Sequence, residues 1–269
     1  MRISVEHVTR YRYGDEASYA VQSLRLTPGS YDGHKVLDWA VESRPAGQML
    51  ASRDGFGNAV HLLTIDTPHR EIEIVARGHV DVEDRHGIVR GGLEPVPLRV
   101  FLRRTELTTA TPEVEAVAKA VPAAEAITWL HGLMDEIRRR VDYRTGITTS
   151  ETTAAEALAH GVGVCQDHAH IFVAAARACG FPARYVTGYL LTTGEHTEAA
   201  HHAWAEAHVD ALGWVGFDVA NAICPTDRYV RIASGLDARY AAPVRGTRRG
   251  TASETLEVEV KVERRGDQQ

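Results

Sequence analysis

Several features that identify other classes of protein are missing from this sequence of 269 residues. No stretch approaches the roughly 20 consecutive apolar residues of a membrane-spanning helix. The amino terminus, MRISVEHVTRYRYG, lacks the apolar segment of a signal peptide. Basic residues are dispersed among acidic ones and the net charge is −6, so we expect no nucleic-acid partner and no membrane partner. The expectation is a globular protein of the cytoplasm.

Cysteine is scarce as well. The chain contains only Cys165, Cys179 and Cys224, an odd number without the paired spacing of a metal site. This set is more typical of free cysteines in a reducing compartment than of cysteines joined in disulfides. The chain is long enough to bury a sizeable core, either as one large domain or as two smaller ones.

The first clear pattern in the sequence is an alternation of apolar and polar residues. Apolar residues recur with period two through residues 1–84, as at Ile3 and Val5 and at Ile72 and Ile74, and turn-forming residues separate the segments. This pattern predicts short antiparallel strands, and their number favours an antiparallel β-sandwich-like domain.

Residues 85–111 are irregular and rich in glycine and proline, which predicts a linker. Helical spacing follows, with three helices expected before residue 163, the third starting at a capping box of Thr153 and Glu156. A fourth helix over about 163–179 leads into period-two strands at residues 184–191, 203–209 and 214–219, with a polar loop at residues 192–200 bordering the cleft. The predicted fold class is α+β, with residues 112–269 forming a domain in which a helix packs on an antiparallel sheet.

Cys165 stands at the start of the fourth helix, in the segment GVGVCQDHAH. The glycines before it allow a close approach of the backbone, and the free N–H groups and positive dipole end of a first helical turn favour a thiolate. A lone cysteine is more often a small core residue, and Cys179 and Cys224 keep that interpretation. Cys165 is the candidate nucleophile.

A thiol nucleophile needs a base, and the base needs a group that orients its ring. The segment HHAWAEAHV offers His201, His202 and His208, among which the local sequence does not choose. Asp218, in GWVGFDVAN, is flanked by residues typical of a core and so requires a partner. Because side chains alternate across a strand, His202 and Asp218 share a face only if an odd-length connection or a bulge joins their strands.

A zinc site is a rival interpretation, with ligands drawn from Cys165, His168, His170, His201 and His202. Within a helix, however, His168 and His170 point about 200° apart, so both cannot join one site. We therefore expect no metal site. His168 is interpreted as a packing or cleft-lining residue, and Asp167 as a partner of the helix start rather than an acid catalyst.

Three segments in this order resemble the motifs of the bacterial transglutaminase-like proteins, a group with a papain-like fold often described as cysteine proteases. GVGVCQDHAH resembles the nucleophile motif, HHAWAEAHV the histidine motif and WVGFDVAN the aspartate motif. The first hundred residues, including DGFGN, resemble the β-rich amino-terminal domain of the same group. In this family Pro-Thr commonly follows the aspartate, whereas here Val219 and Ala220 do.

The resemblance implies that Cys165 is the nucleophile, His202 the general base and acid, and Asp218 the orienting carboxylate. The backbone N–H of Cys165 would be one oxyanion donor, and the second is unassigned. The implied reaction is acyl transfer on peptide or amide bonds of a peptide or protein substrate through an acyl-enzyme, with no cofactor. The alternative is a catalytically silent scaffold that binds peptides or supports assembly. The oligomeric state is not indicated by the sequence.

Overall fold

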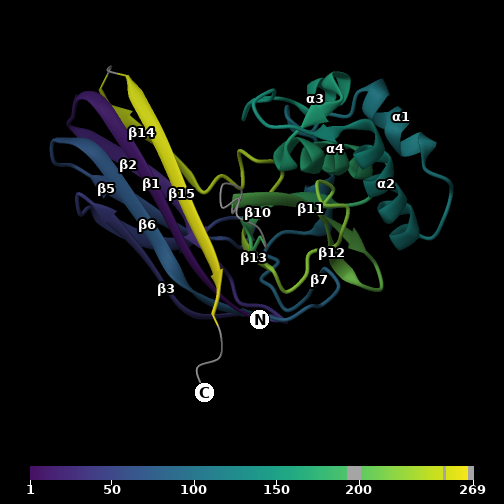
Figure 1. The fold of residues 1–269 in the computed structure, drawn as a ribbon, viewed down its shortest axis with the longest axis horizontal. Coiled ribbons are helices and arrows are strands. Elements are labelled where there is room, and N and C mark those ends of the chain that lie inside the picture. Colours follow the sequence, from purple (N-terminus) through teal and green to yellow (C-terminus); the bar gives the residue numbers. More distant parts are fainter. Residues whose placement is uncertain (193–200, 251–252, 266–269) are drawn as a thin grey trace.

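A computed structural model describes residues 1–192, 201–250 and 253–265, so the predicted loop at residues 192–200 lies almost entirely outside the described residues. The chain forms two lobes, a β-sandwich and a lobe of helices on a mixed-length antiparallel sheet (Figure 1). This arrangement confirms the predicted fold class. No helix among the described residues is both long and apolar enough to cross a lipid bilayer.

The sandwich consists of two four-stranded sheets. The first has the order β15-β1-β6-β3 and the second β14-β2-β5-β4. Their bounds are β1 Arg2–Ala17, β2 Tyr19–Thr27, β3 His34–Arg44, β4 Gln48–Arg53, β5 Ala59–Ile65, β6 His69–Val82, β14 Val244–Arg249 and β15 Glu254–Arg264. The alternating apolar residues of both sheets meet in one buried cluster that includes Leu24, Leu63 and Ile74.

The sandwich takes strands from both ends of the described chain. Strand β15 pairs with β1 along its whole length, from Ile3 opposite Arg264 to Tyr13 opposite Glu254, and β14 pairs with β2. The predicted domain of residues 112–269 assigned these two strands to the catalytic lobe, whereas their hydrogen bonds are made to the amino-terminal sheets. The division into two folding units stays a prediction, but this pairing moves its carboxy-terminal boundary to the segment before β14.

The second lobe is built on the sheet β13-β10-β11-β12-β7. Its strands are β7 Ile88–Val89, β10 Ala183–Leu190, β11 His201–Val209, β12 Gly213–Phe217 and β13 Tyr229–Gly235. The helices are α1 Pro112–Ala120, α2 Ala126–Arg140, α3 Ala154–His160 and α4 Cys165–Ala178, with a 3₁₀ turn η1 at Leu98–Leu102 and a small parallel pair of β8 Asp142–Tyr143 and β9 Val162–Gly163. The capping box of Thr153 and Glu156 forms as predicted.

Helix α4 is buried over most of its length, and it packs between the other helices and strands β10 and β11. Its apolar residues, among them Phe172, Val173 and Ala176, lie in the cluster that also holds Ala203, Ala205 and Ala207 of β11. Small alanines on the strand allow the helix to approach the sheet closely, which fixes the amino-terminal end of α4 relative to β11.

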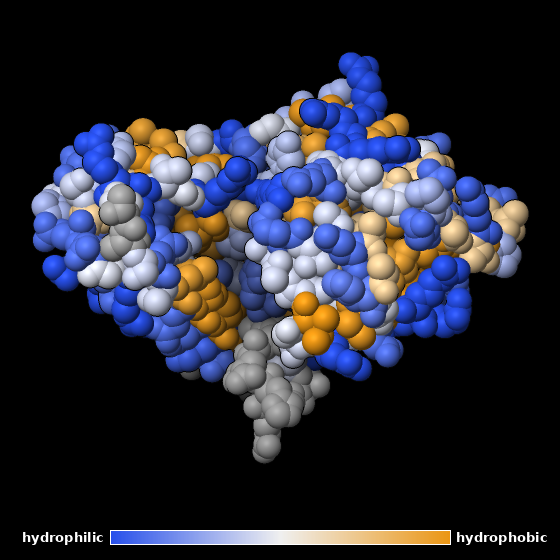
Figure 2. Space-filling model, turned by 90° about the horizontal axis from the view of Figure 1, so that it is seen from above, coloured by the Kyte–Doolittle hydropathy of each residue, from blue (hydrophilic) through white to orange (hydrophobic). Residues whose placement is uncertain are grey.

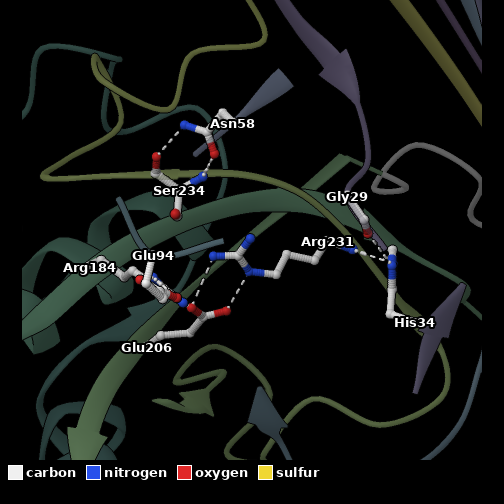
Figure 3. A network of polar contacts seen from close by, with 8 residues as sticks. All are labelled: Gly29, His34, Asn58, Glu94, Arg184, Glu206, Arg231 and Ser234. Atoms are coloured by element: carbon white, nitrogen blue, oxygen red, sulfur yellow. Dashed lines mark hydrogen bonds and ion pairs between the residues drawn. The ribbon is translucent and has the colours of Figure 1, made fainter. Parts of the chain in front are cut away.

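The predicted linker does more than connect the lobes. Strand β7 pairs with β12, and Glu94 accepts hydrogen bonds at 3.0 Å from Arg184 of β10. Arg184 also donates to Glu206 at 2.5 Å, and Arg231 of β13 donates to the same carboxylate at 2.8 Å (Figure 3). Burial by itself would raise the pKa of Glu206, but the charges of Arg184 and Arg231 lower it to about 2. The carboxylate is therefore charged and doubly paired inside the protein.

Two further contacts join the sandwich to β13. The Asn58 side chain donates to the Ser234 carbonyl at 2.7 Å and accepts from the Ser234 N–H at 2.9 Å (Figure 3). His34 accepts from the Arg231 N–H at 3.3 Å, while its other ring nitrogen lies 2.9 Å from the Gly29 carbonyl. These bonds, with an apolar cluster shared by β1, β6, β10 and β13, hold the two lobes in one orientation.

Candidate active site

Cys165 is the first residue of α4, where the backbone N–H groups have no partner within the helix. Its side chain is partly exposed. The helix start is held by Asp167, whose Oδ2 accepts from the Val164 N–H at 2.7 Å and from the Thr148 hydroxyl at 2.6 Å. A side chain at Gly163 would have its Cβ 2.7 Å from that of Asp167, so only glycine allows this close approach. Asp167 thus has the predicted structural role.

His202 and Asp218 lie on one face of the β11–β12 hairpin. Val209 pairs with Gly213, so three residues connect the two strands. A connection of odd length is what places His202 and Asp218 on the same face, as the sequence predicted. His202 Nε2 lies 2.7 Å from Asp218 Oδ2, and the two side chains are 7% and 0% exposed. Since Nε2 is engaged by the carboxylate, Nδ1 is the ring nitrogen left for Cys165.

The three predicted residues are coupled electrostatically. Burial by itself would lower the pKa of His202, but hydrogen bonds to Asp218 and to Cys165, with the charges of both, raise it to about 10. Burial would raise the pKa of Asp218, and the hydrogen bond and charge of His202 outweigh it and lower the pKa. The structure thus brings the cysteine, histidine and aspartate together, and the arrangement favours a protonated His202 beside a charged Asp218.

Two residues of the site escaped the sequence analysis. Asp218 Oδ2 also accepts from the Tyr229 hydroxyl and from the Asn221 side chain, each at 2.7 Å, and Oδ1 accepts from the Asn221 N–H at 3.2 Å. Asn221 lies within the aspartate motif and could have been proposed from it. Tyr229 opens β13 and carries no local signal, because only the sheet brings it beside β12.

The other candidate histidines are engaged elsewhere. His201 Nε2 lies 2.9 Å from the Thr187 hydroxyl, on the opposite face of β11 from His202. His208 packs edge-on against Trp214, at the far end of the strand. Both ring nitrogens of His168 face backbone carbonyls, those of Val164 at 2.9 Å and Val141 at 3.0 Å. His168 therefore packs inside the protein, as predicted.

Two tyrosines border Cys165. Burial raises the pKa of Tyr143, and the charges of Cys165 and Asp218 raise it further. Burial likewise raises the pKa of Tyr185 well above its usual value, with Cys165 as the next contribution. Both hydroxyls are therefore protonated at neutral pH. Cys224 lies farther off, 3.5 Å from His131, and burial raises its pKa to about 11.

A cysteine on the first turn of a buried helix, packed against an antiparallel sheet, defines the class of papain-like folds used by cysteine-dependent enzymes. Two family descriptions match the chain, the bacterial transglutaminase-like N-terminal region over residues 3–81 and the transglutaminase-like superfamily over residues 115–219. Among solved structures, a protein of Cytophaga hutchinsonii whose name proposes a cysteine protease superposes with a TM-score of 0.77 at 22% identity, covering 99% of this chain and 92% of that one. That likeness establishes the fold.

Relatives extend over nearly the whole chain. An uncharacterized protein of Mycobacterium bovis is 30% identical over 273 residues, covering 91% of this chain and 87% of that protein. An uncharacterized protein of Mycobacterium leprae is 28% identical over 98% of this chain and 99% of its own length. This chain belongs to the bacterial transglutaminase-like proteins, as its motifs suggested.

Proposed function

We propose that this protein is an enzyme that transfers the acyl group of a peptide or amide bond through Cys165, His202 and Asp218. The observation that carries the proposal is the buried 2.7 Å contact between His202 and Asp218, with Cys165 close enough to His202 to raise the pKa of the imidazole. A pair of this kind activates a thiol and orients the imidazole that later protonates the leaving group.

In the proposed reaction the Cys165 sulfur attacks the carbonyl carbon, and the Cys165 N–H donates to the oxygen that becomes negative. His202 gives its proton to the leaving amine, which departs and leaves a thioester on Cys165. Water or a second amine, deprotonated by His202, then attacks the thioester and frees the thiol. Water gives hydrolysis and an amine gives transamidation.

The part of the site that the structure describes favours an enzyme over a silent scaffold. A scaffold does not need a charged aspartate held by three donors or a partly exposed cysteine at a helix start, and this site has both. A free thiol of this kind persists best in a reducing compartment, so we propose that the protein works in the cytoplasm.

The test is the rate of iodoacetamide alkylation at Cys165 from pH 5 to pH 9, followed by peptide mass spectrometry. Because a protonated His202 stabilises the thiolate, we expect fast alkylation below pH 7, and a fall of about tenfold or more at pH 6 in His202→Ala. His208→Ala, on the same strand but away from Cys165, is the control and should react as the natural protein does. Slow alkylation that rises only near pH 8.5, unchanged in His202→Ala, would remove the basis of the proposal.

A further inference from the structure

A cavity lined by described residues lies between the two lobes, beside the start of α4. Its volume is about 380 Å³, enough for one or two amino-acid side chains. The helical lobe contributes Gln166, Tyr185 and Thr187 to its lining, and the segment leading into the sandwich contributes Arg239, Pro243 and Arg245. Figure 2 shows the surface hollowed between the two lobes.

This cavity adjoins the proposed nucleophile. Gln166 directly follows Cys165, and Tyr185 is close enough to Cys165 for the thiol's charge to raise the pKa of the phenol, after the larger effect of burial. His201, which also lines the cavity, directly precedes His202. A substrate whose carbonyl rests on Cys165 can therefore extend a neighbouring side chain into this space.

Most polar groups of the lining already have partners. Arg239 is paired with Glu106, at 2.6 Å, and with Glu151, so its charge is compensated twice. The Gln166 amide donates to the Ser150 carbonyl at 3.3 Å. Arg239, Glu106 and Glu151 together carry one net negative charge, and Arg245 is the other arginine of the lining.

Two groups of the lining have no such partner within the described residues. Tyr185 as a whole residue is 4% exposed, and its hydroxyl makes no hydrogen bond to another described residue. Arg245, exposed on β14, makes no ion pair within the same residues. A protonated phenol and a guanidinium are both donors, and the ligand that satisfies two donors and one positive charge is a carboxylate.

We propose that this cavity binds the side-chain carboxylate of an acidic residue next to the reacting carbonyl, with Arg245 as its cation and the Tyr185 hydroxyl as its hydrogen-bond donor. The inference rests on the proposed function, because the cavity matters to the reaction only if Cys165 is the nucleophile. It assigns the substrate class as peptides that carry aspartate or glutamate beside the bond attacked.

The test uses alkylating probes that need no known substrate: iodoacetyl-Glu-amide, iodoacetyl-Gln-amide and iodoacetyl-Lys-amide, with iodoacetyl-Gly-Glu-amide and iodoacetyl-Gly-Gln-amide to place the charge one residue farther away. Rates at Cys165 are divided by the rate with plain iodoacetamide, and Cys165→Ala corrects for the other two cysteines. We expect one of the acidic probes to react about tenfold faster than its amide counterpart at low salt, which is the value of one charge-assisted hydrogen bond.

Arg245→Gln should abolish this preference, and Tyr185→Phe should reduce it, because the phenyl ring keeps its packing against His170 and loses only the donor. Arg249→Gln, an exposed arginine of β14 that does not line the cavity, should keep the preference. All variants are checked for an unchanged melting temperature.

The outcomes separate the two proposals. Equal rates for acidic and amide probes, with Cys165 still fast toward iodoacetamide at pH 6, would overturn the carboxylate site and leave the proposed function standing. A preference that persists in Arg245→Gln would overturn the assigned residue pair. If Cys165 is slow toward every probe and toward iodoacetamide, the proposed function fails and the inference fails with it.

Discussion

The Asp218 carboxylate accepts four hydrogen bonds from described residues, from His202, Tyr229 and, twice, Asn221. A carboxylate held by several donors keeps its charge and cannot rotate, so it fixes the plane of the His202 ring. Tyr229 and Asn221 are therefore positioning residues that act on the proposed nucleophile through Asp218 and His202.

Replacing Tyr229 by phenylalanine tests this role. The change removes one charge-assisted hydrogen bond worth about 1.5–3 kcal/mol and keeps the ring that packs on Trp204. We expect the pH at which Cys165 loses its reactivity to rise, with alkylation at pH 6 slowed by about tenfold. Tyr19→Phe, at an exposed tyrosine of β2, is the control. An unchanged pH profile in Tyr229→Phe would assign the hydroxyl a packing role only.

Among the elements, β10, β11 and β13 are joined by more than their ladder of backbone bonds. Glu206 on the central strand β11 receives Arg184 from β10 and Arg231 from β13, so one carboxylate ties three neighbouring strands together. The Arg184 guanidinium also lies 3.9 Å from the centre of the Trp214 ring on β12. The sheet that carries His202 and Asp218 is thus cross-linked by charge on the face turned away from α4.

We expect Glu206→Gln to be strongly destabilising, because it leaves the Arg231 guanidinium without its counter-charge and Arg184 with Glu94 alone. Breaking a buried pair in this way costs about 3–5 kcal/mol. The measurement is the urea midpoint at constant slope, compared with Glu83→Gln, whose exposed pair with Arg85 should contribute less than about 1 kcal/mol. Equal midpoints for the two variants would mean that the buried network is not needed for stability.

The sequence predicts those structural features that are caused by interactions between residues close together in the chain. Helix α4 and the capping box at Thr153 and Glu156 follow from residues within a few positions of each other, and both were predictable. The hairpin register followed from the requirement that His202 and Asp218 share a face.

Pairings between distant segments have no such local cause. Nothing in the alternation of residues 254–264 distinguishes β1 as its partner from any other strand with the same period. The contact of Tyr229 with Asp218 and the pairing of Glu94 with Arg184 depend on the same long-range arrangement. These features required the structure.

For the molecule as a whole, buried histidines set the response to pH. Burial lowers the pKa of His7 to about 3, of His34 to about 4 and of His170 to about 3, from an ordinary 6.5. Below pH 6.5 the unfolded chain binds protons at these sites while the folded protein does not. The free energy of unfolding therefore decreases as the pH is lowered below 6.5. His202 behaves oppositely: its raised pKa stabilises the fold below pH 6.5, and this contribution is lost as the pH rises toward 10.

We therefore expect the free energy of unfolding to be highest near pH 6.5. On the acid side each of the three histidines contributes a slope of up to about 1.4 kcal/mol per pH unit. Urea midpoints at pH 5, 6.5 and 9 measure both sides, and His202→Ala should flatten the alkaline side while the acid side remains. A midpoint that does not change between pH 6.5 and pH 5 would show that these histidines are not neutral in the folded protein.

Strand β15, which pairs with β1, is synthesised long after its partner. Strands β1 and β2 are synthesised early, but the strands that cover their outer edges, β14 and β15, emerge only after the whole helical lobe. Until then the nascent sandwich presents two bare edges, which are templates for pairing with other chains. A ribosome that stalls before residue 244 would thus release a polypeptide whose helical lobe is complete but whose sandwich lacks two strands. Such a polypeptide is expected to aggregate through the two unpaired edges.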